Sequence, residues 1–176
     1  MALTLPRLAR TSAALATALL TGLLAAPTAS AAPAAATSVT TTCTPTCVTA
    51  TRYATYPDHD RLVFDFTADG LPQVKTWKNT DGRYSVGGSG QTEHLTTPGT
   101  SYLFFEFFGA HTFNDAGQPT YTSPTLQQPN LPVLKGIQAL GDYEGYVDFG
   151  ISLGPSSRYN VFTLTQPNRV VVDIYR

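Results

Sequence analysis

Residues Leu103–Phe108 read Leu-Phe-Phe-Glu-Phe-Phe, and this aromatic run is the stretch of sequence that decides the fold. Bulky side chains at consecutive positions leave neither face of a strand polar, so the run predicts a strand covered on both faces. A helix could also bury such a run, but Gly109 ends it and Pro98-Gly99 precedes it. These flanks and the aromatic content favour a central β-strand.

Alternating apolar and polar residues elsewhere predict shorter strands that cover this one. No segment shows a long helical period, and turns rich in Gly and Pro separate the apolar stretches. The expected fold is therefore all-β, either an antiparallel β-sandwich or a half-open barrel. The other strands are expected at residues 48–53, 61–66, 73–77, 137–140, 146–153, 159–165 and 169–175.

The connections between these strands differ in length. Residues 79–100 are predicted to form a loop with one short extended segment at 84–86. Residues 110–132 form a long connection with four prolines, and loops of this length in compact domains are often functional. Residues 141–145 read as a hairpin turn, and residues 131–137 could hold one short helical turn.

The N-terminus predicts export. Arg7 and Arg10 precede an apolar run at 13–26, and Ala29-Ser30-Ala31 fits a cleavage site for a secretory signal peptide. The apolar run is too short for a permanent membrane span, so we expect a secreted protein, extracellular or associated with the cell wall. The expected organisation is a signal peptide at 1–31, a disordered Ala/Thr-rich linker at 32–42 and a β-domain at 43–176.

Composition limits the partners and the domain count. The chain carries 11 Lys and Arg against 12 Asp and Glu, and the predicted leader contains two arginines and no acid. The exported part is therefore acidic, which argues against nucleic acid as a partner. The remaining length suits one domain with a real core, and we expect a monomer.

Cys43 and Cys47 are the two cysteines of the chain. In an exported protein such a pair predicts a disulfide, here one that pins the start of the domain. The alternative is a metal or redox pair, but a metal site needs more ligands and no histidine lies nearby. We expect no metal and no cofactor.

Two framing strands and three internal motifs carry a resemblance. Asp60–Phe66 begins the predicted domain and Pro167–Ile174 ends it, and between them lie Ala110-His111, Gly117–Tyr121 and Gly141–Gly145. This order and spacing resemble the AMIN-like domain of secreted or lipid-anchored bacterial proteins, related to the AMIN domain of wall amidases and pilus secretins. The resemblance covers roughly residues 48–176. It implies a β-sandwich with an envelope-binding role and no catalytic residues, whereas the Cys-Thr-Pro-Thr-Cys segment departs from the family pattern.

Two groups of charged residues have a structural and a functional interpretation. Asp58-His59-Asp60 could supply metal ligands or an acid–base cluster, but adjacent residues in a Pro-started turn cannot converge on one ion, which favours a solvated turn. Glu106 interrupts the aromatic run, and a buried unpaired carboxylate there would be costly. We expect Glu106 to pair with Arg61 or Arg169, with a buried catalytic carboxylate as the alternative.

A hydrolytic site is the second functional interpretation. His111 and Asp115 could be a general base and its orienting acid, and Ser123 is an available hydroxyl, although no nucleophile-elbow pattern surrounds it. Asp142 and Glu144 could act as a glycosidase pair. More simply, His111 ends a strand and Asp115 shapes a turn. The alternative function is a small secreted hydrolase that acts on cell-wall glycan or peptide.

The favoured function is binding without catalysis. The long connection and the 141–145 turn present tyrosine rings that can lie flat on sugar rings or anchor a protein interface. The same tyrosines could instead close one end of the sandwich. We expect the partner to be cell-wall polymer (peptidoglycan) or an envelope protein. The candidate binding residues are Tyr121, Tyr143, Tyr146, His111, Asp115, Asp142 and Glu144.

Overall fold

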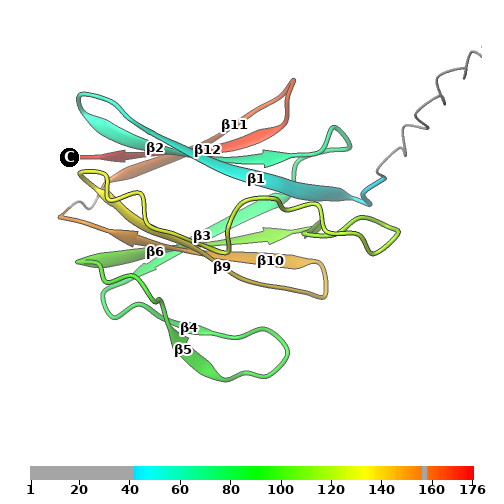
Figure 1. Ribbon diagram of the computed structural model, residues 1–176, viewed down its shortest axis with the longest axis horizontal. Helices are drawn as coiled ribbons and strands as arrows, with labels where there is room; N and C mark the ends of the chain where they lie inside the picture. Colours follow the sequence, from blue (N-terminus) through cyan, green and yellow to red (C-terminus); the bar gives the residue numbers. More distant parts are fainter. Residues whose placement is uncertain (1–41, 156–157) are drawn as a thin grey trace, which may run out of the picture. The chain divides into compact units, whose positions relative to one another are not determined.

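A computed structural model describes residues 42–155 and 158–176, and within these residues the regular structure is entirely β-strand (Figure 1). The all-β prediction is therefore confirmed. The predicted signal peptide and all of the predicted linker except Thr42 lie outside the described residues. The strands are β1 Thr46–Thr55, β2 His59–Phe66, β3 Gln73–Asn79, β4 Arg83–Ser85, β5 Thr92–His94, β6 Ser101–Phe108, β7 Ala110–His111, β8 Leu126–Gln127, β9 Leu134–Tyr143, β10 Tyr146–Leu153, β11 Tyr159–Leu164 and β12 Arg169–Tyr175.

Two five-stranded sheets pack face to face as a sandwich (Figure 1). The first sheet has the order β11-β12-β2-β1-β7, and the second has the order β3-β6-β10-β9-β8. A small β4–β5 hairpin lies on the side of the second sheet that faces away from the first (Figure 1). The predicted antiparallel pairing holds except between β1 and β7, where Thr46 and Ala110 are register partners in a parallel pair.

The aromatic run forms β6, which lies between β3 and β10 in the second sheet. Leu103, Phe105 and Phe107 point into the space between the sheets and are completely buried. Phe104 points the other way and is covered by the β4–β5 hairpin, where it packs with Tyr84. The predicted cover on both faces is therefore confirmed for the first part of β6.

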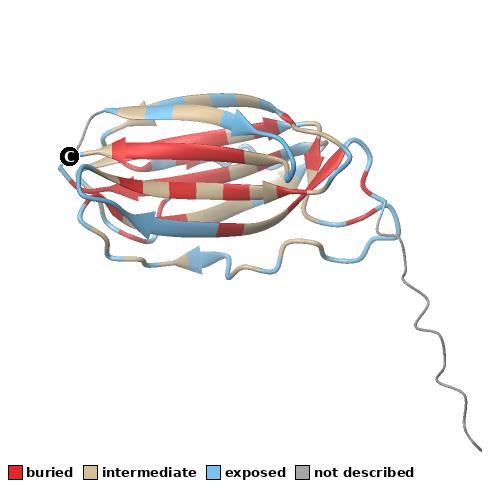
Figure 2. Ribbon diagram, turned by 90° about the horizontal axis from the view of Figure 1, so that it is seen from above, coloured by how far each residue is buried: buried red, intermediate tan, exposed pale blue. Residues whose placement is uncertain are grey.

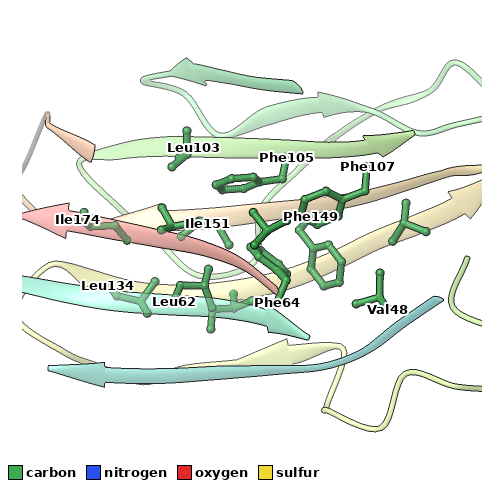
Figure 3. Packing of buried hydrophobic residues seen from close by; sticks show 14 of the residues in the cluster. Val48, Leu62, Phe64, Leu103, Phe105, Phe107, Leu134, Phe149, Ile151 and Ile174 are labelled. Carbon is green, nitrogen blue, oxygen red and sulfur yellow. The ribbon is translucent and has the colours of Figure 1, made fainter. Parts of the chain in front are cut away.

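Phenylalanine rings make the centre of the core (Figure 3). Phe64 of the first sheet meets Phe107 and Phe149 of the second, in each case with ring centroids 4.9 Å apart and edge-to-face geometry. Each fully buried ring contributes roughly 2–3 kcal/mol through the apolar area that it removes from water. Buried residues follow the inner strands, including β12 at the C-terminus, and become fewer toward the sheet edges (Figure 2).

Asp60 corrects the prediction of a solvated turn at 58–60, because His59 already begins β2 and the Asp60 side chain is completely buried. Its carboxylate accepts hydrogen bonds from the N–H groups of Val133 and Leu134 at 2.6 and 2.9 Å. Burial alone would raise the pKa of Asp60, but these N–H groups and the Thr55 hydroxyl outweigh it and lower the pKa. Asp60 thereby ties the start of β9 to the first sheet.

The same attachment explains why the helical turn predicted at 131–137 is absent from the described residues. Leu134 already begins β9, which runs on to Tyr143. The predicted 141–145 turn is shorter than expected, because β9 continues to Tyr143 and only Glu144 and Gly145 connect it to β10. Both turn residues have positive φ, 51° and 80°. A two-residue turn of this kind matches the twist of its flanking strands.

Residues 79–100, predicted as a loop, contain the β4–β5 hairpin. The extended segment predicted at 84–86 overlaps β4, whereas the three residues of β5 are too few for the alternation of polar and apolar residues to reveal that strand. The predicted disulfide between Cys43 and Cys47 is confirmed, and both cysteines are buried.

Candidate functional site

His111 and Asp142, two of the predicted site residues, lie side by side. His111 is at the end of β7, and its Nδ1 is 3.3 Å from an Asp142 carboxylate oxygen. The other carboxylate oxygen accepts hydrogen bonds from the N–H and the hydroxyl of Thr112, at 2.6 and 2.9 Å. Asp142 therefore holds the chain just after β7 through Thr112, and His111 contacts the second oxygen of the same carboxylate.

The other members of the predicted hydrolytic set lie elsewhere. Asp115 accepts hydrogen bonds from the N–H and the hydroxyl of Thr44, inside the disulfide loop. The turn that Asp115 was expected to shape is held instead by the Asn114 side chain, which accepts hydrogen bonds from two N–H groups within the loop. The Ser123 hydroxyl accepts a hydrogen bond from the N–H of Thr51 at 3.0 Å. The base, acid and hydroxyl of the second interpretation do not converge.

Tyr121 is part of the packing rather than of an exposed surface. Its ring packs edge-on against Phe149 in the core, with centroids 5.6 Å apart. Its hydroxyl is within hydrogen-bond distance of the Thr51 hydroxyl and of the Gln127 amide. Desolvation by burial raises the pKa of this hydroxyl. We therefore leave Tyr121 out of the surface described next.

Tyr143 and Tyr146 do form a surface, together with Phe108, which the sequence interpretation did not include. The three residues are register partners on β9, β10 and β6, so their side chains share the outer face of the second sheet. They are 49%, 38% and 44% exposed, and the rings of Tyr146 and Phe108 lie 4.9 Å apart. We call Phe108, Tyr146 and Tyr143 the aromatic row.

The loop between β4 and β5 approaches one end of the aromatic row. A Cβ placed on Gly88 would lie 3.0 Å from a ring carbon of Tyr143, and the backbone there has φ of 79°. Glycine accommodates both the close approach and the positive φ without strain. A hydrogen bond with Glu144 raises the pKa of the Tyr143 hydroxyl. Glu144 itself is exposed in the turn beside the row.

A hollow of about 370 Å³ lies beside the row, on the same face of the sheet. We call it the outer pocket. Its floor consists of Lys75, Glu106 and Asp148, which are register partners on β3, β6 and β10. On β6 and β10 these residues lie two positions along from the aromatic row. The hairpin residue Tyr84 and the apolar Leu140 complete its wall. The residues that matter to its chemistry are Lys75, Trp77, Tyr84, Glu106 and Asp148.

Glu106 pairs with Lys75 in this pocket, at 3.2 Å, which corrects the predicted pairing with an arginine. Lys75 is the register partner of Glu106 on the neighbouring strand β3, whereas the two predicted arginines belong to the other sheet. Arg61 instead makes two hydrogen bonds with Asp173, at 2.6 and 2.8 Å. Arg169 donates to the carbonyl oxygen of Pro167.

Asp148 is the register partner of Glu106 on β10, so two carboxylates stand on adjacent strands. Its Oδ1 is buried and has no hydrogen-bond partner among the described residues. Desolvation, followed by repulsion from Glu106, raises the pKa of Asp148 to about 6. A second hollow of about 350 Å³ shares Lys75 and Glu106 with the outer pocket and reaches Phe108 and Tyr146. The pocket and the aromatic row are therefore continuous, and together they form what we call the aromatic face.

The outer surface of the first sheet differs, and we call it the paired face. Arg52 and Asp65 form a two-fold hydrogen-bonded ion pair with both distances at 2.6 Å. Arg61 and Asp173 form the second such pair, and the Asp173 side chain is only 8% exposed. The guanidinium of Arg61 also lies over the ring of Phe162.

Sequence reasoning missed Phe108, Lys75, Trp77 and Asp148 as candidate site residues. Phe108 was assigned to the core with the rest of the aromatic run. It is the last residue of β6, and its side chain is exposed there. The signal for Lys75 and Trp77 was their alternation within one predicted strand, while Asp148 stands between Val147 and Phe149 in the predicted strand at 146–153. The alternation places the Lys75 and Trp77 side chains on one face, but it does not say which strand lies beside them.

Within 42–155 and 158–176, no three His, Cys, Asp or Glu side chains are grouped as a metal ion would require. The same part of the chain contains no helix of the length and hydropathy needed to cross a membrane.

Comparison with known proteins identifies the domain. The AMIN-like domain profile matches residues 46–176, from the first residue of β1 to the C-terminal residue. Searches of curated proteins and of solved structures gave no significant match. The match spans most of the chain and includes both framing strands and all three internal motifs that suggested the resemblance. The chain therefore belongs to the AMIN-like domain family.

Proposed function

We propose that this protein is a non-catalytic secreted envelope module that binds cell-wall polymer, peptidoglycan, through its aromatic face. The observation that carries the proposal is the aromatic row, three exposed rings held in register on a sheet. Aromatic rings can lie flat against sugar rings, and hydroxyl groups such as those of Tyr143 and Tyr146 add hydrogen bonds. Neighbouring exposed aromatic rings on one face support an interaction site there.

Family membership supports an envelope context for this activity. The proposed route is export through the 1–31 signal peptide, with the domain released or loosely bound at the wall as a monomer. An envelope protein is the alternative partner, because aromatic rings anchor protein interfaces as well. Glu144 is exposed in the turn beside the aromatic row and would supply a polar contact. Asp142 is the register partner of the core residue Val147 and holds Thr112 and His111, so these residues lie off the face, and Asp115 lies at the disulfide loop.

Sedimentation of the purified protein with isolated cell walls tests the proposal. Phe108→Ala and Tyr146→Ala should each weaken binding by roughly 1–2 kcal/mol, about tenfold, because each removes an anchoring ring. Tyr53→Ala is the matched control, since Tyr53 is similarly exposed, at 44%, but lies on β1 of the other sheet. Failure of the wild-type protein to sediment would refute wall binding and favour a protein partner. Equal binding by all variants would refute the aromatic face.

A hydrolase remains the second candidate, favoured by one specific observation. Glu106 and Asp148 stand on adjacent strands, and the pKa of Asp148 is raised to about 6, as in a pair of carboxylates with separate acid and base roles. A muropeptide-release assay with the purified protein decides this point. We expect no release. Release that is lost in Asp148→Asn would establish the hydrolase in place of the binding module.

A further inference from the structure

The outer pocket has an unbalanced set of charges. Glu106 and Asp148 contribute two carboxylates, and Lys75 is the only cation among the residues that line the pocket. Lys75 is already bound to Glu106, and its side chain is 70% exposed. Ionised Asp148 therefore leaves one negative charge without a counter-ion inside the pocket.

Asp148 carries this charge at a position that costs stability. The side chain is partly withdrawn from water, and its buried Oδ1 has no hydrogen-bond partner among the described residues. A carboxylate so placed is stabilised most by a donor that also carries positive charge, since charge-assisted hydrogen bonds are the strongest. The raised pKa of Asp148 reflects the same deficit.

The walls of the pocket suit a small organic cation. Trp77 is stacked on Phe104 with centroids 5.3 Å apart, so its ring is held in place by the covered part of the sheet. Lys75 Nζ lies 5.7 Å from the centroid of the Trp77 ring, so the ring is placed where an ammonium group makes a cation–π contact. Tyr84 adds a second aromatic wall, and burial together with its hydrogen bond to Glu93 raises its pKa to about 12, so its hydroxyl stays neutral.

We propose that the outer pocket binds a primary ammonium group carried by the wall polymer, with Asp148 and Glu106 as its acceptors and Trp77 as its aromatic wall. The proposal rests on the proposed function for the source of the amine, which is either an amino-sugar ring or the side chain of a diamino acid in a peptide. A divalent metal fits less well, because it requires more oxygen ligands than two carboxylates provide.

Trp77 offers a direct readout, because it is the only tryptophan in the chain. The experiment is a fluorescence titration of the purified protein with butylammonium chloride, and with sodium butyrate and butanol at matched ionic strength. Only butylammonium should give a saturable change, with a Kd in the millimolar range expected for so small a ligand. No saturable change, or an equal response to butyrate or butanol, would overturn the proposal.

Three variants assign the binding to the pocket. Asp148→Asn and Glu106→Gln should each weaken butylammonium binding at least tenfold, because each removes one acceptor charge. Asp69→Asn is the matched control, since Asp69 is an exposed carboxylate outside the pocket. Unchanged affinity in the two pocket variants, or an equal loss in the control, would show that the ammonium binds elsewhere.

The pH dependence supplies an independent check. The charged and titratable groups around Asp148 are Lys75, Glu106, Tyr84 and, through Tyr84, Glu93. Butylammonium affinity should rise as the pH increases from 5 to 7, because Asp148 ionises in this interval. An affinity that is constant over this range would contradict the role of Asp148.

The source of the amine is found with paired probes. Glucosamine is compared with N-acetylglucosamine, and Nα-acetyl-lysine amide with its Nε-acetylated form. Loss of binding on acetylation in either pair supports the proposal and names the source of the amine. If each acetylated probe binds as tightly as its unacetylated partner, the proposal is refuted. If butylammonium does not bind but walls still sediment in a Tyr146-dependent manner, this inference fails while the proposed function stands. If butylammonium binds and walls do not sediment, the proposed function fails and the amine must come from another source.

Discussion

The two outer surfaces of the sandwich use charge in opposite ways. On the paired face, Arg61 and Asp173 satisfy each other through two short hydrogen bonds. On the aromatic face, Lys75 and Glu106 make one longer contact at 3.2 Å, and the neighbouring Asp148 has a buried oxygen with no partner among the described residues. The same sheet presents three exposed rings beside these charges.

This difference separates scaffold from site. Two-fold arginine–carboxylate pairs have a fixed geometry and leave little charge for a ligand to use. An unpartnered carboxylate beside exposed aromatic rings is unfavourable in the free protein, and it becomes favourable only when a partner covers it. Groups with perturbed pKa values gather at functional sites for this reason. The contrast favours the aromatic face as the binding surface.

The largest expected effect lies on the paired face. Asp173→Ala should lower the free energy of unfolding by about 3 kcal/mol, because it leaves the partly buried Arg61 guanidinium without its counter-charge. Urea denaturation measures the loss. The double variant Arg61→Met with Asp173→Leu should recover most of the stability, since it removes both charges together. If the single variant is as stable as wild type, the Arg61–Asp173 pair does not stabilise the fold, and the two faces do not differ in the way described above.

A smaller effect of opposite sign is expected on the aromatic face. Asp148→Asn should stabilise the protein by about 1 kcal/mol at pH 7, because it removes a desolvated charge next to Glu106. The folded-state pKa of Asp148 is about 6 against an ordinary value of 3.8, so the stability that Asp148 contributes below pH 3.8 is lost as the pH rises through 6. The gain from the variant should therefore be complete above pH 6 and vanish below 3.8.

Thermal unfolding of both proteins across this pH range makes the measurement. The exposed variant Asp69→Asn should show no such pH-dependent gain. A variant that is destabilised at pH 7 would mean that Asp148 has a favourable partner, which would remove the basis for an open site on this face.

The smallest expected effect concerns Lys75. Lys75→Met should change the stability by less than about 0.5 kcal/mol, because the Lys75 side chain is mostly exposed and surface ion pairs contribute little. It should nevertheless raise the pKa of Asp148 further, since Lys75 is the cation that lowers it. Trp77 fluorescence followed against pH reports this shift, with Asp148→Asn as the control that lacks the transition. A transition that moves to lower pH would contradict the charge arrangement of the pocket.

Much of the fold could be predicted because it depends on local pattern. Consecutive bulky residues at Leu103–Phe108 require cover on both sides, and the structure provides the first sheet on one side and the hairpin on the other. The last hairpin, expected at 159–165 and 169–175, forms with almost these bounds as β11 and β12. Both features follow from side-chain alternation and turn residues, which act within a few positions along the chain.

The site depended on which strands are neighbours, and alternation does not contain that information. Glu106 was expected to pair with an arginine, but the partner is the residue that register places beside it on β3. Asp60 was expected in solvent because its neighbours form a turn, yet N–H groups at residues 133 and 134 hold its carboxylate in the core. Tyr121 follows the alternative interpretation, in which the tyrosines close one end of the sandwich, because its ring packs against Phe149 of another strand.

The most direct test of the central claim is a map of the binding surface by amide NMR spectroscopy. The purified protein is titrated with soluble peptidoglycan fragments, and shifts are followed on both outer faces. We predict that the perturbed residues lie on the aromatic face, around Phe108, Tyr146 and the Trp77 indole, while Arg52 and Arg61 on the paired face do not shift. Perturbation centred on the paired face, with the aromatic face unchanged, would contradict the account.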